Sequence, residues 1–523
     1  MFKRGLCVCI AVTVAFCGVI WRLGAIAMNS GEYTAKLSSG FLEYAGVRRG
    51  DIFDCNGERL VNDSEYCAVA VLPNDVSSEI AMCLTDEQKN MLESGGAVII
   101  KAKIGSEAQK AAENSGLVSV KMFERYADEI APHIIGYTDE SGHGVCGIEK
   151  SFDEYLYGGR VGFRFKRDAN GDVLCGIAPE VVYEDSAGSV TLTIDRRIQI
   201  IAQTAAGKYL KSGAVAVIDN ASGEIRAVCS LPCFDRGDLQ SSLARKDTPF
   251  INRALCAYSC GSVFKLCTGA AALECGCAGG HICSGSEKIG DVVFGCLKRH
   301  GNMNLEKAVA YSCNSYFISL GQKIGAQRAY RMAKLMGFGA QNTLCGGIAD
   351  SSGSLNDIDD LMRNPAALAN FSFGQGQVMT TPLQIASMVQ CIANGGKRFV
   401  PSLIKSAVDK DGRVCGYDSS AAVNVMSNTT ADTLKKCMMA TVEYGTGKSA
   451  KPNGGVCGGK TATAQTGKYD EKGAEYLQAW FAGFIECENG SYSIAVMAEN
   501  GVTGGVSAAP VFREIANGIA AMG

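Results

Sequence analysis

A serine and a lysine three residues apart, Ser262 and Lys265, carry the side chains needed for acyl-transfer chemistry. The apolar run from Val263 to Leu273 predicts a buried helix, and Cys275-Gly276 supplies a glycine for its left-handed end. Residues three apart share one face of a helix, so the hydroxyl and the amine meet in its first turn. Burial favours the neutral amine, which then serves as the base that turns the serine hydroxyl into a nucleophile.

Two further motifs support a catalytic role for this pair. The spacing alone is weak, because Ser402 and Lys405 repeat it in a stretch that predicts a strand entering a hairpin. Downstream of the pair lie Ser312-Cys313-Asn314 and Lys460-Thr461-Ala462-Thr463. Taken alone, the Ser312-Cys313-Asn314 motif is also compatible with a helix cap, and Lys460-Thr461 is compatible with the start of an exposed strand. All three motifs in this order are typical of enzymes that form a serine acyl-enzyme.

The chain resembles the class B penicillin-binding proteins, the peptidoglycan D,D-transpeptidases of cell elongation, division and sporulation. Further segments outside the three motifs extend this resemblance over most of the chain after residue 45. These segments are Gly147-Ile148-Glu149-Lys150, Thr193-Ile194-Asp195, Asn252-Arg253-Ala254, His300-Gly301, Gly374-Gln375-Gly376 and Thr381-Pro382-Leu383-Gln384. Two positions depart from the family pattern. Cys260 stands where a proline is common, and Ala462 replaces the glycine of Lys-Thr-Gly.

The resemblance implies a role for each of five catalytic residues. Ser262 attacks the penultimate D-alanine carbonyl of a stem peptide, terminal D-alanine leaves, and an amine of a neighbouring stem closes the cross-link. Lys265 is the base in acylation, and Ser312 relays a proton to the leaving amine. Asn314 holds the substrate amide, and Lys460 supplies positive charge. The same serine accepts β-lactams, which inhibit by forming a slow acyl-enzyme.

Substrate binding is assigned by the same resemblance to two segments. Thr461 and Thr463 bind the terminal carboxylate through their hydroxyls, with Ala462 between them. The backbone N–H groups of Ser262 and Thr463 form the oxyanion hole, and residues 374–376 shape the groove. We hypothesise that the Ala462 methyl narrows the groove and lowers β-lactam affinity. An unchanged acylation rate in Ala462→Gly would contradict that hypothesis.

Two other functions use the same residues. One is a hydrolase, either a D,D-carboxypeptidase or a β-lactamase, in which water instead of an amine attacks the acyl-enzyme. The other is a non-catalytic cell-wall scaffold or β-lactam sensor, with Ala462 as a mark of decay. The long N-terminal region and the lack of an obvious extra deacylating base favour transfer. The retained motif residues favour an enzyme.

Cysteines and histidines are dense just after the nucleophile helix. Three states are open for this region: a zinc site, a disulfide between Cys283 and Cys296, and free thiols. The residues concerned are Cys275, Cys277, His281, Cys283, Cys296 and His300. Their spacing matches no standard zinc signature, so free thiols are favoured and neither a metal nor a cofactor is expected.

The domain organisation expected is an anchor, a pedestal and a catalytic domain. Residues 1–28 join a basic start to an apolar run long enough for a bilayer, with a cleaved signal peptide as the alternative. Residues 29–185 form a pedestal or dimerisation domain, and residues 186–523 form the transpeptidase domain. The enzyme is then a single-pass protein of the cell membrane, with its catalytic domain outside the cytoplasm.

The fold class expected is α+β, because predicted strands at both ends of the catalytic domain flank a helical middle. Residues 214–219, 224–228, 479–485 and 492–497 predict strands, and residues 196–210 and 509–522 predict helices. The family fold is an antiparallel sheet covered by helices, as in serine β-lactamases. The net charge of −3 excludes an electrostatic nucleic-acid binder. The expected partners are stem peptides that end in D-Ala-D-Ala, the membrane and a membrane glycosyltransferase.

Overall fold

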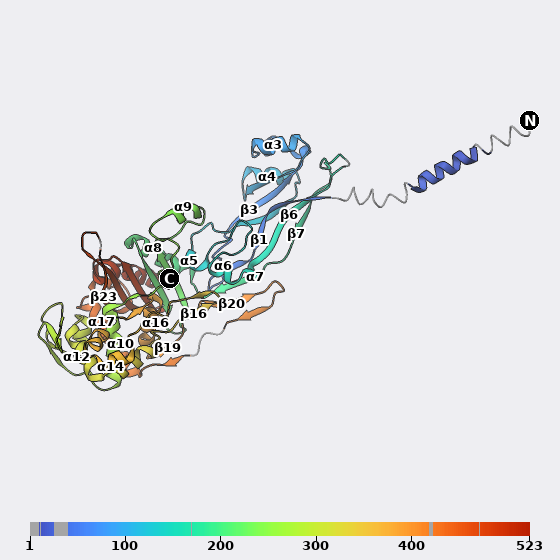
Figure 1. The fold of residues 1–523 in the computed structure, drawn as a ribbon. Coiled ribbons are helices and arrows are strands. Elements are labelled where there is room, and N and C mark those ends of the chain that lie inside the picture. The colour runs from blue at the N-terminus through green and yellow to red at the C-terminus, as the bar shows by residue number, and fades with distance from the viewer. Residues whose placement is uncertain are drawn as a thin grey trace, which may run out of the picture. The chain divides into compact units, whose positions relative to one another are not determined.

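The computed structural model describes residues 10, 12–25, 40–168, 170–417, 422–469 and 471–522. The chain divides into two compact units (Figure 1). The first comprises residues 1–49, 62–127 and 158–187, and the second comprises residues 50–61, 128–157 and 188–523. Segments 50–61 and 128–157, which the sequence analysis assigned to the pedestal, therefore belong to the second unit. One reason is that β2 (Asp51–Phe53) pairs in parallel with β8 (Ser189–Leu192).

The described part of the N-terminal segment is a short helix over residues 12–25. Among the described residues, no helix combines the length and the apolar character needed to cross a membrane. Of the anchor predicted at residues 1–28, residues 1–9, 11 and 26–28 lie outside the described residues.

The first unit has two three-stranded sheets, with strand orders β1-β6-β7 and β4-β3-β5. Side chains alternate along β3, so Val69 and Val71 pack with the helices, whereas Ala68 and Ala70 pack with Val161 and other β6 residues. The elements are β1 (Phe41–Arg49), β3 (Ser64–Val71), η1 (Pro73–Asp75), α2 (Ser78–Ala81), α3 (Asp86–Glu93), β4 (Val98–Lys103), α4 (Glu107–Asn114), β5 (Ser119–Glu124), β6 (Tyr157–Phe165) and β7 (Glu180–Tyr183).

The second unit is built on an antiparallel five-stranded sheet of order β10-β9-β25-β24-β23 (Figure 1). Its strands are β9 (Gly213–Asp219), β10 (Ile225–Leu231), β23 (Val456–Tyr469), β24 (Glu475–Cys487) and β25 (Gly490–Glu499). The four strands predicted from sequence coincide with β9, β10, β24 and β25, apart from Glu224, which lies one residue before β10. The first and the last stretches of the domain thus meet in one sheet, which confirms the α+β prediction.

Helices cover both faces of this sheet because its side chains alternate between them. Val215 and Val217 of β9 pack with α8 (Arg196–Tyr209) and α18 (Ala509–Ala520). The intervening positions of β9 are alanines at 214 and 216, which leave room for α16 (Pro382–Ala393) against the same strand. Thr381 and Gln384 form a capping box at the start of α16, which explains why Thr-Pro-Leu-Gln appears there as a motif.

A cluster of helices adjoins α16 and carries two of the three motifs (Figure 1). Its central helix, α10 (Lys265–Glu274), contacts α11 (Leu305–Ala310), α12 (Asn314–Ile324), α13 (Ala326–Leu335) and α17 (Asn428–Glu443). This helix buries almost its whole surface, as its apolar composition predicts. Helix α15 (Pro365–Ser372) packs on α12.

The other elements of the second unit are short. They are α5 (Pro132–Ile135), α6 (Gly147–Ser151), α7 (Asp153–Leu156), α9 (Leu239–Ala244), β11 (Tyr258–Ser259), η2 (Gly261–Phe264), β12 (His281–Cys283), β13 (Ser286–Ile289), β14 (Val292–Gly295), β15 (Gly301–Met303), β16 (Thr343–Cys345), β17 (Ile348–Ala349), α14 (Ile358–Arg363), β18 (Met379–Thr380), β19 (Lys397–Arg398), β20 (Ile404–Val408), β21 (Val414–Gly416), β22 (Val423–Asn424), η3 (Lys448–Ala450) and η4 (Gly504–Ala508).

Candidate active site

Ser262 lies in the single turn η2, which leads directly into α10. The turn begins at Gly261, whose φ of +56° lies in the left-handed region that favours glycine. A Cβ at Gly261 would also stand 3.1 Å from the Cβ of Ala464 on β23. Glycine at position 261 therefore lets η2, the turn that carries Ser262 and that we call the nucleophile turn, approach β23 at the edge of the sheet. The predicted end of α10 is confirmed as well, since Gly276 has a φ of +66°.

Lys265 is fully buried at the first position of α10, and it is hydrogen-bonded to the Ser-x-Asn motif. Its Nζ donates to the Ser312 backbone oxygen at 2.8 Å, to Ser312 Oγ at 3.2 Å and to Asn314 Oδ1 at 2.6 Å. Burial lowers the pKa of Lys265 to about 7, while nearby cysteines act in the opposite direction. A lysine with this pKa is partly neutral at physiological pH, so it is able to accept a proton.

Ser312 and Asn314 are placed by the junction between α11 and α12. Ser312 has a φ of +57°, which is uncommon for a residue with a side chain and is found most often at functional sites. Cys313 is the N-cap residue of α12, and Asn314 is its first residue. Asn314 Nδ2 donates to the Gly295 backbone oxygen at 2.9 Å, which fixes the amide so that Oδ1 faces Lys265.

The third motif lies on β23, which is the edge strand of the five-stranded sheet. Because β23 pairs only with β24 in this sheet, its outer edge carries backbone groups without a strand partner. That edge faces the nucleophile turn, since η2 contacts β23. An extended peptide is able to add to such an edge through main-chain hydrogen bonds.

Lys460 is fully buried on β23, and its Nζ donates to the Thr461 backbone oxygen at 2.8 Å. Burial lowers the pKa of Lys460 well below its usual value, and the charge of Lys265 acts in the same direction. The positive charge of Lys265 thus disfavours a second positive charge on Lys460.

A cleft of about 730 Å³ joins the three motifs. Ser262, Ser312, Asn314 and residues 461–463 line it, whereas Lys265 and Lys460 lie beneath its walls. Gln375 and Gly376 line the cleft as well. Gly374 instead packs behind the nucleophile turn, because a Cβ there would lie 2.1 Å from the Gly261 backbone oxygen. The structure thus brings the predicted site residues together, with Gly374 in a supporting position.

Ala462 lies in a regular strand position, paired with Trp480, and its backbone is not left-handed. The replacement of glycine therefore carries no conformational cost. Its methyl group lines the cleft and points toward the nucleophile turn, since a Cβ at Gly261 would be 3.5 Å from it. The methyl group occupies space beside Ser262.

Sequence reasoning missed several cleft residues that lie outside the motifs. Thr446 Oγ1 is 2.6 Å from Thr461 Oγ1, so the two hydroxyls are hydrogen-bonded. Gly504 donates its N–H to Thr463 Oγ1 at 3.3 Å. Both positions lie in glycine-rich turns, Gly445-Thr446-Gly447 and Thr503-Gly504-Gly505, and that was the available signal.

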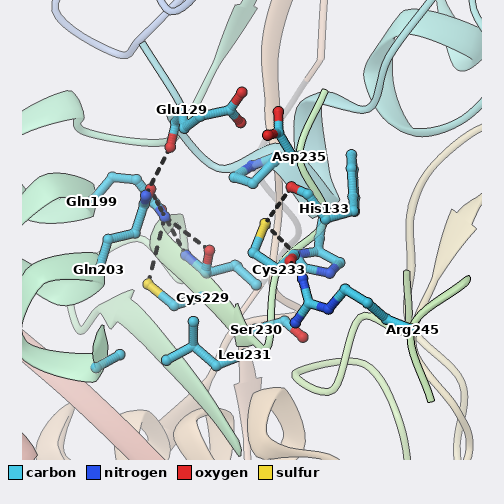
Figure 2. A pocket seen from close by; sticks show the side chains of 14 residues that line it. Glu129, His133, Gln199, Gln203, Cys229, Ser230, Leu231, Cys233, Asp235 and Arg245 are labelled. Carbon is cyan, nitrogen blue, oxygen red and sulfur yellow. Dashed lines mark hydrogen bonds between the residues drawn. The ribbon is translucent and has the colours of Figure 1, made fainter. Parts of the chain in front are cut away.

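A second cavity, of about 350 Å³, lies apart from these motifs (Figure 2). It holds a cysteine and a histidine side by side, with Cys233 Sγ 3.9 Å from His133 Nδ1. Burial raises the pKa of Cys233 to about 11 and lowers the pKa of His133 to about 4. These shifts favour a neutral thiol and a neutral ring, which is the opposite of an activated Cys–His pair. The residues of the three motifs converge in the cleft beside Ser262.

Comparisons with known proteins agree with this site. A family model described as "Penicillin binding protein transpeptidase domain" matches residues 213–517. Stage V sporulation protein D of Bacillus subtilis is 28% identical, over 98% of this chain and 84% of that protein. The probable peptidoglycan D,D-transpeptidase PenA of Neisseria gonorrhoeae is 25% identical, over 95% of this chain and 90% of that protein. A solved structure described as "Structural coordination of polymerization and crosslinking by a peptidoglycan synthase complex" has a similar fold, with a TM-score of 0.70, 24% identity and 98% of each chain covered.

Proposed function

We propose that this chain, which belongs to the class B penicillin-binding proteins, is a peptidoglycan D,D-transpeptidase that cross-links stem peptides through an acyl-enzyme on Ser262. The observation that carries the proposal is the convergence of Ser262, the Ser312–Asn314 wall and the β23 edge on one cleft. Buried Lys265 connects the first two.

Acylation begins when the Ser262 hydroxyl gives its proton to neutral Lys265 and its oxygen attacks the D-alanine carbonyl. A neutral lysine has two N–H donors and one lone pair. The two N–H groups of Lys265 donate to the Ser312 backbone oxygen and to Asn314 Oδ1. The lone pair therefore remains available to accept a proton from a hydroxyl. Ser312 Oγ, at 3.2 Å from Lys265, then passes the proton to the leaving D-alanine amine.

The oxyanion that forms is stabilised by the backbone N–H groups of Ser262 and Thr463. Removal of one such donor typically lowers the rate by about 10²–10³. Thr461 and Thr463 bind the substrate carboxylate, and the Lys460 amine beneath them adds positive charge when it is protonated. The Thr461 hydroxyl is held in place by the Thr446 hydroxyl, and the Thr463 hydroxyl accepts a hydrogen bond from the Gly504 N–H.

Transfer, as opposed to hydrolysis, is supported by the lining of the cleft. Its lining among the described residues contains no Asp, Glu or His. Among the described residues, the cleft lining thus offers water no carboxylate or imidazole as a second base in addition to Lys265. An amine acceptor carries its own nucleophilic nitrogen once it is deprotonated.

The membrane setting belongs to the proposal as well. The apolar residues near the N-terminus would hold the enzyme at the cell membrane with its catalytic unit outside the cytoplasm. A membrane glycosyltransferase would supply the glycan strands. The fold similarity to a chain of a peptidoglycan synthase complex supports a search for this partner.

Labelling with a fluorescent penicillin tests the proposal. We expect the purified enzyme to form a stable adduct that peptide mapping places on Ser262, and we expect Ser262→Ala to form none. Ser402→Ala, in the unrelated tetrad on the loop before β20, is the matched control and should label like the parent. A stem-peptide thioester then separates transfer to D-amino acids from hydrolysis. An adduct on another residue, or turnover by water alone, contradicts the proposal.

A further inference from the structure

Four sulfur and nitrogen donors meet beside the Ser-x-Asn motif. Cys283, Cys296, His300 and Cys313 each direct one donor atom to a common point, and these atoms all lie within 4.8 Å of one another. Cys283 ends β12, Cys296 follows β14, His300 precedes β15 and Cys313 caps α12. The four residues come from three separate segments, namely β12, the loop between β14 and β15 that holds Cys296 and His300, and the start of α12, so local sequence alone does not account for their convergence.

The distances within the cluster match a tetrahedral metal site. With Zn–S bonds near 2.3 Å and Zn–N bonds near 2.0–2.1 Å, two sulfurs stand about 3.8 Å apart and a sulfur and a nitrogen about 3.6 Å apart. Cys296 Sγ is 3.8 Å from Cys313 Sγ. His300 Nδ1 is 3.4 Å from Cys296 Sγ and 3.6 Å from Cys283 Sγ.

The surroundings of Cys296 favour a thiolate. The Asn314 backbone N–H donates to Cys296 Sγ at 3.2 Å, at the positive end of α12. Cysteines that act only as small apolar groups pack their sulfur against carbon. Here Cys283 and Cys313, which have no exposed surface, turn their sulfur toward other metal-binding groups.

We propose that Cys283, Cys296, His300 and Cys313 bind one Zn²⁺ ion. Three thiolates and one imidazole form a standard structural zinc set, and soft sulfur ligands select zinc over Mg²⁺ or Ca²⁺. His300 binds through Nδ1, so its other ring nitrogen carries the proton. Binding releases three thiol protons to solvent, and no oxidant or reductant takes part.

The position of this site ties the metal to the substrate cleft. Cys313 separates Ser312 from Asn314, and Gly295, which precedes Cys296, accepts the Asn314 side-chain hydrogen bond. The Ser312–Asn314 segment is thus held at Cys313, a proposed ligand, and at Gly295, the residue before the proposed ligand Cys296. The zinc holds Ser312 in its left-handed conformation and Asn314 against Lys265.

Metal analysis of protein purified without oxygen and without chelator tests the site directly. We expect about one zinc per chain in the parent, and less than a tenth of that in Cys296→Ser and in Cys313→Ser. Cys277→Ser is the matched control, because Cys277 is close in sequence but outside the cluster, with its thiol bonded to the Cys275 backbone oxygen. It should retain the metal.

Cobalt substitution provides a readout that survives a loss of activity. Co²⁺ in the parent should give the intense visible bands of a tetrahedral thiolate site, and acylation of Ser262 by penicillin should shift them. A parent chain with no zinc, or a Cys296–Cys313 disulfide in place of metal, would overturn the proposal. So would zinc that persists in Cys296→Ser, or cobalt bands that stay unchanged in a chain whose penicillin adduct has been mapped to Ser262. The metal count does not depend on catalysis, so its failure is distinguishable from a failure of the transpeptidase assignment.

Discussion

At the scale of residues, the acid–base chemistry depends on how far each amine is buried. The two cleft lysines have no exposed surface, and desolvation lowers both pKa values. In water a lysine is almost fully protonated at pH 7 and makes a poor base. The same residue inside the protein, held by Ser312 and Asn314, becomes a usable one. Burial, in addition to residue type, makes Lys265 suitable for catalysis.

The pH dependence of acylation should report the pKa of Lys265. Its folded-state pKa is about 7, so the amine is protonated below that pH and neutral above it. The rate of penicillin acylation should therefore rise about tenfold per pH unit below 7 and level off near pH 8. Stopped-flow measurement of adduct formation gives this profile.

A Lys265→Arg variant provides the comparison for that profile. Arginine remains charged at all these pH values, so the acylation rate should fall by about 10²–10⁴ and lose its inflection near pH 7. A parent profile that is flat between pH 5.5 and 8 would count against Lys265 as the base.

At the scale of elements, close approach between segments sets the shape of the cleft. Gly374 has its φ at +79°, and a Cβ on it would clash with the Gly261 backbone oxygen at 2.1 Å. Gly325, which follows α12, has a nearly equal φ of +78°, but a Cβ on it would meet no atom within 4 Å. The two glycines share a positive φ but differ in their surroundings, and Gly325 combines its φ with an extended ψ of 160°.

Gly374→Ala and Gly325→Ala therefore make a matched pair of variants. Both substitutions place an alanine at positive φ, which costs about 1–3 kcal/mol. Only Gly374→Ala displaces the nucleophile turn, so its penicillin acylation rate should fall at least about tenfold, whereas Gly325→Ala should acylate like the parent. Acylation rates measured below the unfolding transition of each variant provide the check. Equal rates in the pair would show that Gly374 does not support Ser262.

At the scale of the whole molecule, the catalytic unit is assembled from three separate stretches of chain. Residues 50–61 and 128–157 belong to it together with residues 188–523. They contribute fully buried side chains to it, among them Ile52, Ile134, Ile135 and Ile148. Full burial of one such side chain stabilises a fold by about 1.5–3 kcal/mol. The catalytic unit therefore depends on residues that precede its main segment.

A chain that begins at Gly188 should be much less stable than one that begins at Gly40. The shorter chain lacks β2 and exposes the side of β8 that β2 covers, so we expect its Tm to fall by more than about 5 °C. Thermal unfolding of both chains, with penicillin labelling as the test of folding, measures the difference. An equal Tm would mean that residues 50–61 and 128–157 add nothing to the unit.

The chemistry and the fold class could be predicted from the amino-acid sequence alone. Ser262 lies in η2 and Lys265 begins α10, and their separation of three residues predicts a hydroxyl beside an amine. The apolar character of residues 214–219 and 479–485 predicted strands, because such stretches must be buried. The strand predictions are confirmed because they depend on local pattern. The structure bonds the Lys265 amine to Ser312 and Asn314, and its proton transfer with Ser262 stays a prediction.

Which distant residues meet is a property of the tertiary structure. Gly374 lies behind the nucleophile turn, and Thr446 is bonded to Thr461. Cys313, which the sequence associates with the Ser-x-Asn motif, joins Cys283 and His300, while Cys275, Cys277 and His281 stay outside that cluster. Linear spacing alone does not predict such contacts, because they result from the packing of β12, the loop between β14 and β15, and α12 against one another.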